Sequence, residues 1–221
     1  MTPLLTSLNF LLMLIKSSWF PIAEEESRRL SELPGGQQRG PGYGKHERAS
    51  MRTEPRRKDR GMKSSRDMEL LLERMPVGRL AVSTAEDPYI VAVNYVFMEG
   101  NICFHSGPAG RKMEALRTDP RVCFMVEEIG PQVLWEKGCG ISQIYKSVVC
   151  FGKAEFVEGQ AEKRAILEKM APKYVPSRYP IPPLKDENIK MTAVIRIVIG
   201  AMSGKENVRS PAHTAITNSP P

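Results

Sequence analysis

The chain has no apolar run long enough to cross a bilayer, and it is poor in cysteine, histidine and aromatic residues. Its only strongly apolar stretch near the start, residues 4–15, has 12 residues, whereas a membrane helix needs about 20. No basic residue precedes this stretch and no A-x-A cleavage site follows it, so it does not resemble a secretory signal. We therefore expect no membrane partner.

The few cysteines exclude a disulfide framework and give little support to a metal site. Cys103, Cys123, Cys139 and Cys150 form no C-x-x-C pair, and only three histidines could assist them. Three of the four, all except Cys139, lie within apolar runs, where a free thiol commonly acts as a small hydrophobic group. The pattern predicts a reducing, cytoplasmic location and no bound metal.

Common catalytic and nucleotide-binding patterns are also missing. No carboxylate pair, Ser/His/Asp set or Cys/His set stands out, so hydrolase chemistry has no candidate residues. Neither G-x-x-x-x-G-K-[ST] nor G-x-G-x-x-G occurs.

The net charge of +7 is unevenly distributed, because residues 1–60 carry 11 Lys+Arg against 7 Asp+Glu. The densest basic run is residues 55–60. Such a segment can contact nucleic acid or an anionic membrane, but it is also typical of a solvated, flexible leader. We favour the leader and expect no nucleic-acid partner.

Composition divides the chain into three parts. Residues 34–50 are rich in Gly, Arg and Gln and show no apolar period, which indicates a linker. We expect a flexible leader over residues 1–55, a folded domain over residues 56–205 and a disordered tail over residues 206–221. Two hypotheses for residues 1–50 stay open: an over-extended gene start with Met51 as the true initiator, and a membrane-associating leader.

The apolar period of the folded part predicts six strands with short helices between them. Ser64 can cap a helix that ends near Met75, and Asp67 lies in its first turn. Further helices are expected over residues 111–118 and 161–170, and Gly152 predicts a bulge. The expected strands are residues 79–83, 89–98, 102–106, 122–127, 145–157 and 192–199.

Most connections between these strands are hairpins or short crossovers rather than regular βαβ units. This favours a mainly β protein, a closed antiparallel barrel, over a doubly wound sheet. Residues 129–142 contain scattered Gly and Pro and show no clear period.

The segment from Phe104 to Lys112, FHSGPAGRK, runs from a strand through a glycine-flanked loop into a helix start. Backbone amides at a helix N-terminus attract anions, and the cations Arg111 and Lys112 follow at once. A phosphate would suit this loop, although a solvated helix cap is the alternative.

Other polar residues in the strands are weaker candidates. His105 is the only histidine in the patterned region, and it is either a hydrogen-bonded structural residue or a group facing a bound ring or substrate. Asn94 interrupts an apolar strand, where a buried amide would need partners from the backbone or from a ligand. Tyr145, Lys146 and Ser147 could serve a phosphate or simply face solvent.

Taken together, the blocks PVGRLAVST, PYIVAVNYVF, GNICFHSGPAGRK, YKSVVCFGKAEFVE and TAVIRIVIGAMSGK resemble the pyridoxamine-5'-phosphate-oxidase-like FMN-binding family, in its nitroimidazole-reductase-like branch. The resemblance covers roughly residues 56–205. It implies a six-stranded antiparallel FMN-binding split barrel, usually a homodimer with FMN at the subunit interface. It further implies an FMN-dependent oxidoreductase that reduces nitro groups of 5-nitroimidazoles or similar small electrophiles.

The resemblance also assigns roles to individual residues. The strand around Val93, Asn94 and Tyr95 would lie along the flavin ring. Phe104, His105 and Ser106 would line its pocket, with His105 as the catalytic residue at the reactive face. The phosphate would be held by Arg111 and Lys112, and the partner subunit would supply Tyr145, Lys146 and Ser147.

Two alternatives remain within this family. The chain could hold flavin or haem without efficient turnover, or it could be a pyridoxamine-phosphate-oxidase-like enzyme. The second is disfavoured because no Arg-x-His element of that enzyme occurs near the C-terminus, and residues 129–143 match the family poorly.

Overall fold

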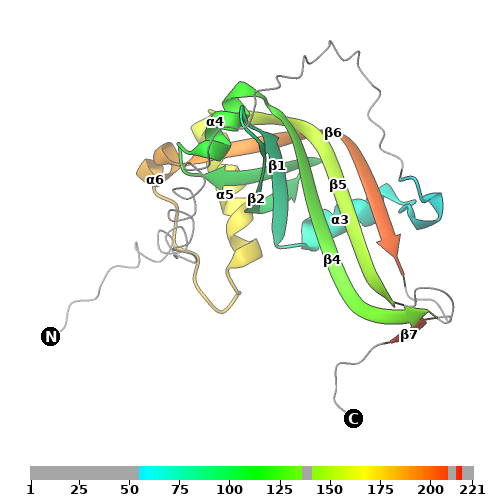
Figure 1. Cartoon of the computed structure of the whole chain (residues 1–221). Helices are drawn as coiled ribbons and strands as arrows, with labels where there is room; N and C mark the ends of the chain where they lie inside the picture. The colour runs from blue at the N-terminus through cyan, green and yellow to red at the C-terminus, as the bar shows by residue number, and fades with distance from the viewer. Residues whose placement is uncertain (1–54, 136–140, 209–212, 216–221) are drawn as a thin grey trace, which may run out of the picture. The chain divides into compact units, whose positions relative to one another are not determined.

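The computed structural model describes residues 55–135, 141–208 and 213–215, and one antiparallel sheet dominates them (Figure 1). In the described residues the sheet has seven strands in the order β1-β2-β3-β6-β5-β4-β7. Because β1 pairs with β4 as well as with β2, the first six of these strands close into a barrel. The predicted mainly β, six-stranded antiparallel barrel is confirmed. The strands are β1 (Val77–Ser83), β2 (Pro88–Met98), β3 (Asn101–Ser106), β4 (Arg121–Trp135), β5 (Ile141–Val157), β6 (Ala193–Asn207) and β7 (His213–Ala215).

Helices connect the strands and cover parts of the barrel. The described helices are η2 (Lys58–Arg60), α3 (Ser65–Arg74), α4 (Arg111–Thr118), α5 (Gln160–Tyr174) and α6 (Asp186–Met191). Helix α4 has the predicted bounds. Helix α5 runs one turn beyond the expected end and includes Pro172, while α6 follows the proline-rich loop and was not expected.

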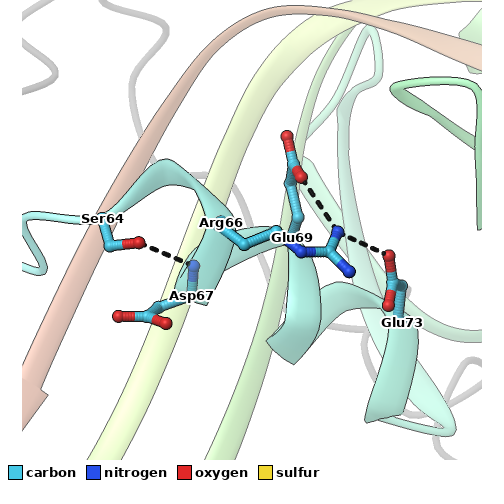
Figure 2. Close-up of polar contacts among 5 residues, drawn as sticks. All are labelled: Ser64, Arg66, Asp67, Glu69 and Glu73. Carbon is cyan, nitrogen blue, oxygen red and sulfur yellow. Dashed lines mark hydrogen bonds and ion pairs between the residues drawn. The ribbon is translucent and has the colours of Figure 1, made fainter.

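Helix α3 begins as the sequence predicts, because the Ser64 hydroxyl accepts a hydrogen bond from the Asp67 amide at 3.1 Å (Figure 2). On its exposed side the Arg66 guanidinium lies between the carboxylates of Glu69, at 3.2 Å, and Glu73, at 3.0 Å. Such exposed pairs contribute little to stability. The helix is held mainly by its apolar side, where Met68, Leu71 and Leu72 are buried in the barrel core.

The barrel core is centred on aromatic side chains from three strands. Tyr95 and Phe124 pack edge to face, with ring centroids 4.9 Å apart, and both are fully buried. The Tyr95 hydroxyl donates to the Leu72 carbonyl at 2.6 Å, which ties α3 to β2. Phe104 on β3 is also fully buried in the same cluster.

A second, smaller cluster lies between the outer face of the barrel and α5. Val96, Cys103 and Val194 on the strands pack there against Ile166 and Met170 of the helix. At the end of α5 the Tyr174 hydroxyl accepts from the Tyr95 amide, and it lies 2.8 Å from the Pro76 carbonyl. The described cysteines are free, and burial raises the pKa of the Cys150 thiol to about 12, so it stays unreactive.

Another part of the outer face is mostly apolar in the single chain. Residues that pair directly across five strands share this face. One row, Ile90, Ala81, Cys123, Phe151 and Ala201, is entirely small or apolar. The next row is mixed, because it includes the charged Arg79 and the polar Ser203 as well as Ala92, Met125 and Val149. All are half-buried or exposed, with Ile90 at 65% exposure.

Strands β4, β5 and β6 extend furthest beyond their predicted bounds. Strand β4 continues to Trp135 and β5 begins at Ile141, so residues 129–142 extend a hairpin, with a register shift between Ile129 and Gln132. Strand β6 continues through Gly200 and Gly204, beyond the expected end at residue 199. The bulge predicted at Gly152 is confirmed by a register shift between β5 and β6.

The expected tail starts within the sheet, because β6 ends at Asn207 and β7 covers residues 213–215. Residues 1–54 and Cys139 lie outside the described residues, so the expectations about the leader stay predictions. No helix among the described residues is long and apolar enough to span a bilayer, and no group of metal-ligating side chains occurs among them.

Candidate functional site

The loop between β3 and α4 has the form that the sequence predicted. Gly110 adopts φ +109°, a conformation that side chains rarely tolerate, and its carbonyl accepts from the amides of Met113 at 2.8 Å and Glu114 at 3.1 Å. The amides of Arg111 and Lys112 precede these bonds, at the helix end where backbone donors lack helical partners. A methyl group placed on Gly107 or Gly110 would meet nothing within 4 Å, so the loop surface is open.

Arg111 lies between this loop and the turn that joins β1 to β2. Its guanidinium carbon is 4.8 Å from the centroid of the Tyr89 ring, and one of its nitrogens is 3.4 Å from the Thr84 hydroxyl. The contact with Thr84 is long, and the side chain is exposed, so most of its donors are available. Sequence reasoning missed Thr84 and Tyr89, because nothing in the linear pattern placed them beside a helix 22 or more residues away.

Lys112 is a half-buried cation for which the described chain provides no carboxylate. Its ammonium nitrogen lies 5.5 Å from the centroid of the Phe104 ring, and none of the ion pairs between described residues involves it. Burial lowers the pKa of Lys112. A negatively charged ligand would remove this penalty, because an opposite charge stabilises the ammonium form.

His105 lies beside this cation at the end of β3, where it pairs with Val194. Its Nδ1 atom is buried and, among the described residues, has no hydrogen-bond partner. Burial first and the charge of Lys112 second lower the pKa of the imidazole, so the ring is neutral at pH 7. The buried, neutral imidazole lowers the free energy of unfolding only as the pH falls through about 6.5, because there the imidazole of the unfolded chain becomes protonated while that of the folded chain does not. A buried, unsatisfied nitrogen is uncommon and points to a missing partner.

Other predicted pocket residues turn out to belong to the barrel core. The side chains of Val93, Tyr95 and Phe104 are all buried in the main cluster, so any contact with a ligand on the outer face would come from their backbone. Asn94 is exposed rather than buried, so its amide needs no protein partner. Ser106 is half-buried at the end of β3.

The chain does not bring Tyr145, Lys146 and Ser147 to this loop. They pair with residues 205–207 of β6, whereas His105 pairs with Val194, which is roughly 35 Å away along the strand at about 3.3 Å per residue. The Ser147 hydroxyl donates to the Lys205 carbonyl at 3.3 Å, and Lys146 lies 3.8 Å from the Glu206 carboxylate. Within one chain these residues therefore lie far from the loop along the sheet.

Comparison with known proteins assigns the chain to a family. Residues 64–206, most of the described chain, match the family of pyridoxamine 5'-phosphate oxidase. The chain belongs to this family. No curated protein matches the chain at a significant level.

Several solved structures have a similar fold, and their descriptions name different functions. A proposed 5-nitroimidazole antibiotic resistance protein of Bacteroides thetaiotaomicron is 25% identical, with a TM-score of 0.57, over 66% of this chain and 85% of that one. The flavocytochrome Anf3 of Azotobacter vinelandii is 20% identical, with a TM-score of 0.67, over 78% and 88%. A FAD and heme binding protein of Mycobacterium smegmatis is 17% identical, with a TM-score of 0.63, over 72% and 84%. The last two show the fold alone.

The described residues of the pyridoxamine 5'-phosphate oxidase fold fit one end of a flavin nucleotide. Two cations without carboxylate partners and two helix amides surround an open glycine loop, which suits a phosphate, and His105 offers an unsatisfied nitrogen beside them. Two cavities, of about 160 and 100 Å³, are lined by neither Arg111 nor His105. The candidate phosphate-binding residues of one chain therefore lie together in the loop itself, outside both of these cavities.

Proposed function

We propose that the protein is an FMN-dependent oxidoreductase that reduces the nitro group of 5-nitroimidazole-type compounds or similar small electrophiles. The observation that carries the proposal is the loop from His105 to Lys112, in which two cations without a carboxylate partner among the described residues adjoin a neutral histidine whose buried Nδ1 atom lacks a partner there as well. The similarity to the Bacteroides protein supports the choice of nitro compounds. The free thiols agree with the cytoplasmic location that we propose with it.

In this proposal the protein residues bind and orient, and the cofactor carries the electrons. A bound, reduced FMN supplies the two electrons for the reduction. Arg111 and Lys112 hold its phosphate, which fixes the position of the nucleotide relative to β2 and β3. A neutral imidazole has one N–H, so His105 can donate a hydrogen bond to a nitro or ring oxygen while its other nitrogen accepts one.

We also propose that the site is completed in a homodimer. The outer face formed by the rows of Ile90 and Ala92 is mostly apolar, and its residues are half-buried or exposed in the single chain, which is typical of a protein interface. A second chain on this face would cover it and would bring the partner's residues toward the flavin site. Sedimentation at micromolar concentration should give twice the mass of one chain, and a monomer would contradict this part of the proposal.

The proposed cofactor and activity are tested on the purified full-length protein. We expect two flavin absorbance bands, release of FMN on denaturation, and consumption of a 5-nitroimidazole once a chemical reductant is supplied. Release of FAD would contradict the choice of FMN, and a Soret band would instead indicate haem. A flavoprotein that consumes no nitro compound would be a binding protein without this activity.

His105→Gln should separate cofactor binding from turnover. The variant keeps a polar side chain but cannot titrate, so we expect unchanged FMN occupancy and a kcat that falls about 10- to 100-fold through the loss of one hydrogen bond in the reaction. Because the neutral ring is the active form, wild-type activity should decline as the pH falls below the lowered pKa of His105. That acidic limb should be absent in the variant. Wild-type kinetics and an unchanged pH profile would assign His105 a structural role only.

A further inference from the structure

A cavity of about 160 Å³ lies where α4, α6 and the paired ends of β5 and β6 meet. Figure 1 shows α4 and α6 at the same end of the sheet. Three cations line the cavity, namely Arg117 from α4, Lys163 from α5 and Lys190 from α6. The only lining carboxylate among the described residues is that of Glu158, so positive charge is in excess.

Lys163 is the most informative of these cations, because only 8% of the residue is exposed. Its ammonium donates to the Thr192 carbonyl at 3.3 Å, and the described chain provides no other hydrogen-bond partner for it. An ammonium has three donors, and burying a charge is costly unless it is paired. No ion pair between described residues includes Lys163, Arg117 or Lys190. The cavity therefore presents cationic donors that pair with no described carboxylate, and Glu158 alone cannot balance the three charges.

The other walls of the cavity are fixed and partly apolar. Phe156 and Val194 line it, and the Arg117 guanidinium carbon lies 5.3 Å from the centroid of the Phe156 ring. Arg117 also donates to the Pro108 carbonyl at 3.0 Å, which holds the guanidinium against the loop that precedes α4. A ligand would thus meet charged donors on one side and a short apolar surface on another.

We propose that this cavity binds a small phosphate-bearing molecule at a site separate from the flavin site. Cavities for drug-sized ligands measure about 300–1,000 Å³, so this smaller one excludes a flavin but admits a phosphate with a short carbon chain. Three cations against one carboxylate match a phosphate, which carries about −1.5 to −2 charges at pH 7, better than a single carboxylate. The site shares no lining residue with the flavin loop except Pro108.

Titration calorimetry on the full-length protein, saturated with FMN in phosphate-free buffer, tests this site. The probes are inorganic phosphate and glycerol 3-phosphate, with acetate as the carboxylate comparison. Lys163→Met removes the buried charge at similar volume and should weaken phosphate binding at least tenfold. Lys169→Met, an exposed position on the same helix that does not line the cavity, is the matched control and should bind as the wild type does. Lys190→Gln, at an exposed residue, gives a second variant should the buried one unfold.

Several results would overturn the proposal. They are a wild type that binds neither phosphate probe, binding that persists in both Lys163→Met and Lys190→Gln, and acetate binding as tight as phosphate. Loss of binding only in an Arg111→Ala, Lys112→Ala double variant would place the phosphate at the flavin loop instead. Should the protein retain no flavin, the same titration on the flavin-free chain still decides the matter, so failure of the proposed function is distinguishable from failure of this site.

Discussion

Replacing Arg111 and Lys112 together by alanine is expected to strip FMN from the purified protein. Both cations adjoin the open glycine loop, and no described carboxylate pairs with either of them. A hydrogen bond to a charged group contributes about 1.5–3 kcal/mol. Loss of both contacts should therefore weaken FMN binding by about 100-fold or more, at 1.4 kcal/mol per factor of ten. The flavin-to-protein ratio after gel filtration and a titration of the apoprotein with FMN measure this effect.

The matched control is Lys153→Ala with Lys169→Ala. It removes two exposed cations that lie away from the loop, so its net charge equals that of the Arg111→Ala, Lys112→Ala protein. This control should retain its flavin. The Arg111→Ala, Lys112→Ala protein should keep its wild-type melting temperature when both proteins are free of flavin, because removing a half-buried, unpaired cation costs the fold little. Full flavin occupancy in the double variant would refute the phosphate assignment, whereas loss in the control as well would indicate a general electrostatic effect.

The loop and the barrel could be predicted because their signals are local. Strand periods of two, the cap at Ser64 and the glycines around residues 107–110 each act over a few residues, and the structure contains all three. The additional length of β4 and β5 was not visible, because Ile129 and Ile141 are 59% and 72% exposed there. In this extension apolar side chains are not confined to one buried face of the strands. The sequence therefore shows no apolar period of two there.

Strand β6 runs past its predicted end at residue 199 and continues through Gly200 and Gly204. A side chain at Gly204 would lie 2.7 Å from the Met62 Cβ atom and from the Met68 sulfur, so the strand needs glycine where the segment before α3 and α3 itself pack on it. The sequence shows a glycine but not the neighbour that requires it.

The candidate site could be predicted only in part, because its parts are distant in the chain. The sequence located His105, Arg111 and Lys112 within one loop, but it gave no indication that Tyr89 and Thr84 contact Arg111. It also could not show which side of β2 faces the core, and the structure buries Tyr95 while exposing Asn94. The distance of Tyr145 from the loop follows from strand register alone, and this is why the proposed site depends on a second subunit.

Gly78→Ala is expected to destabilise the barrel strongly. An added Cβ would lie 1.9 Å from the Cζ atom of Phe124 and within 2.7 Å of both neighbouring ring carbons. The ring cannot move away easily, because it is fully buried and packs edge to face on Tyr95, whose hydroxyl is bonded to α3. Overpacking of this kind costs about 1–3 kcal/mol, and the severity of this contact favours the upper end. At about 2–4 °C per kcal/mol, the melting temperature should fall by roughly 6–12 °C.

The control for Gly78→Ala is Gly107→Ala, because a methyl group there meets nothing within 4 Å and should leave the free energy of unfolding almost unchanged. A double-mutant cycle identifies the cause. Phe124→Leu alone should destabilise the core by creating a cavity, yet in the Gly78→Ala background it should cost less or restore stability, because the smaller side chain makes room for the methyl group. Urea unfolding of the four proteins should give a favourable coupling of about 0.5–3 kcal/mol between the two positions. Strictly additive effects would show that contact with Phe124 is not what requires glycine at position 78.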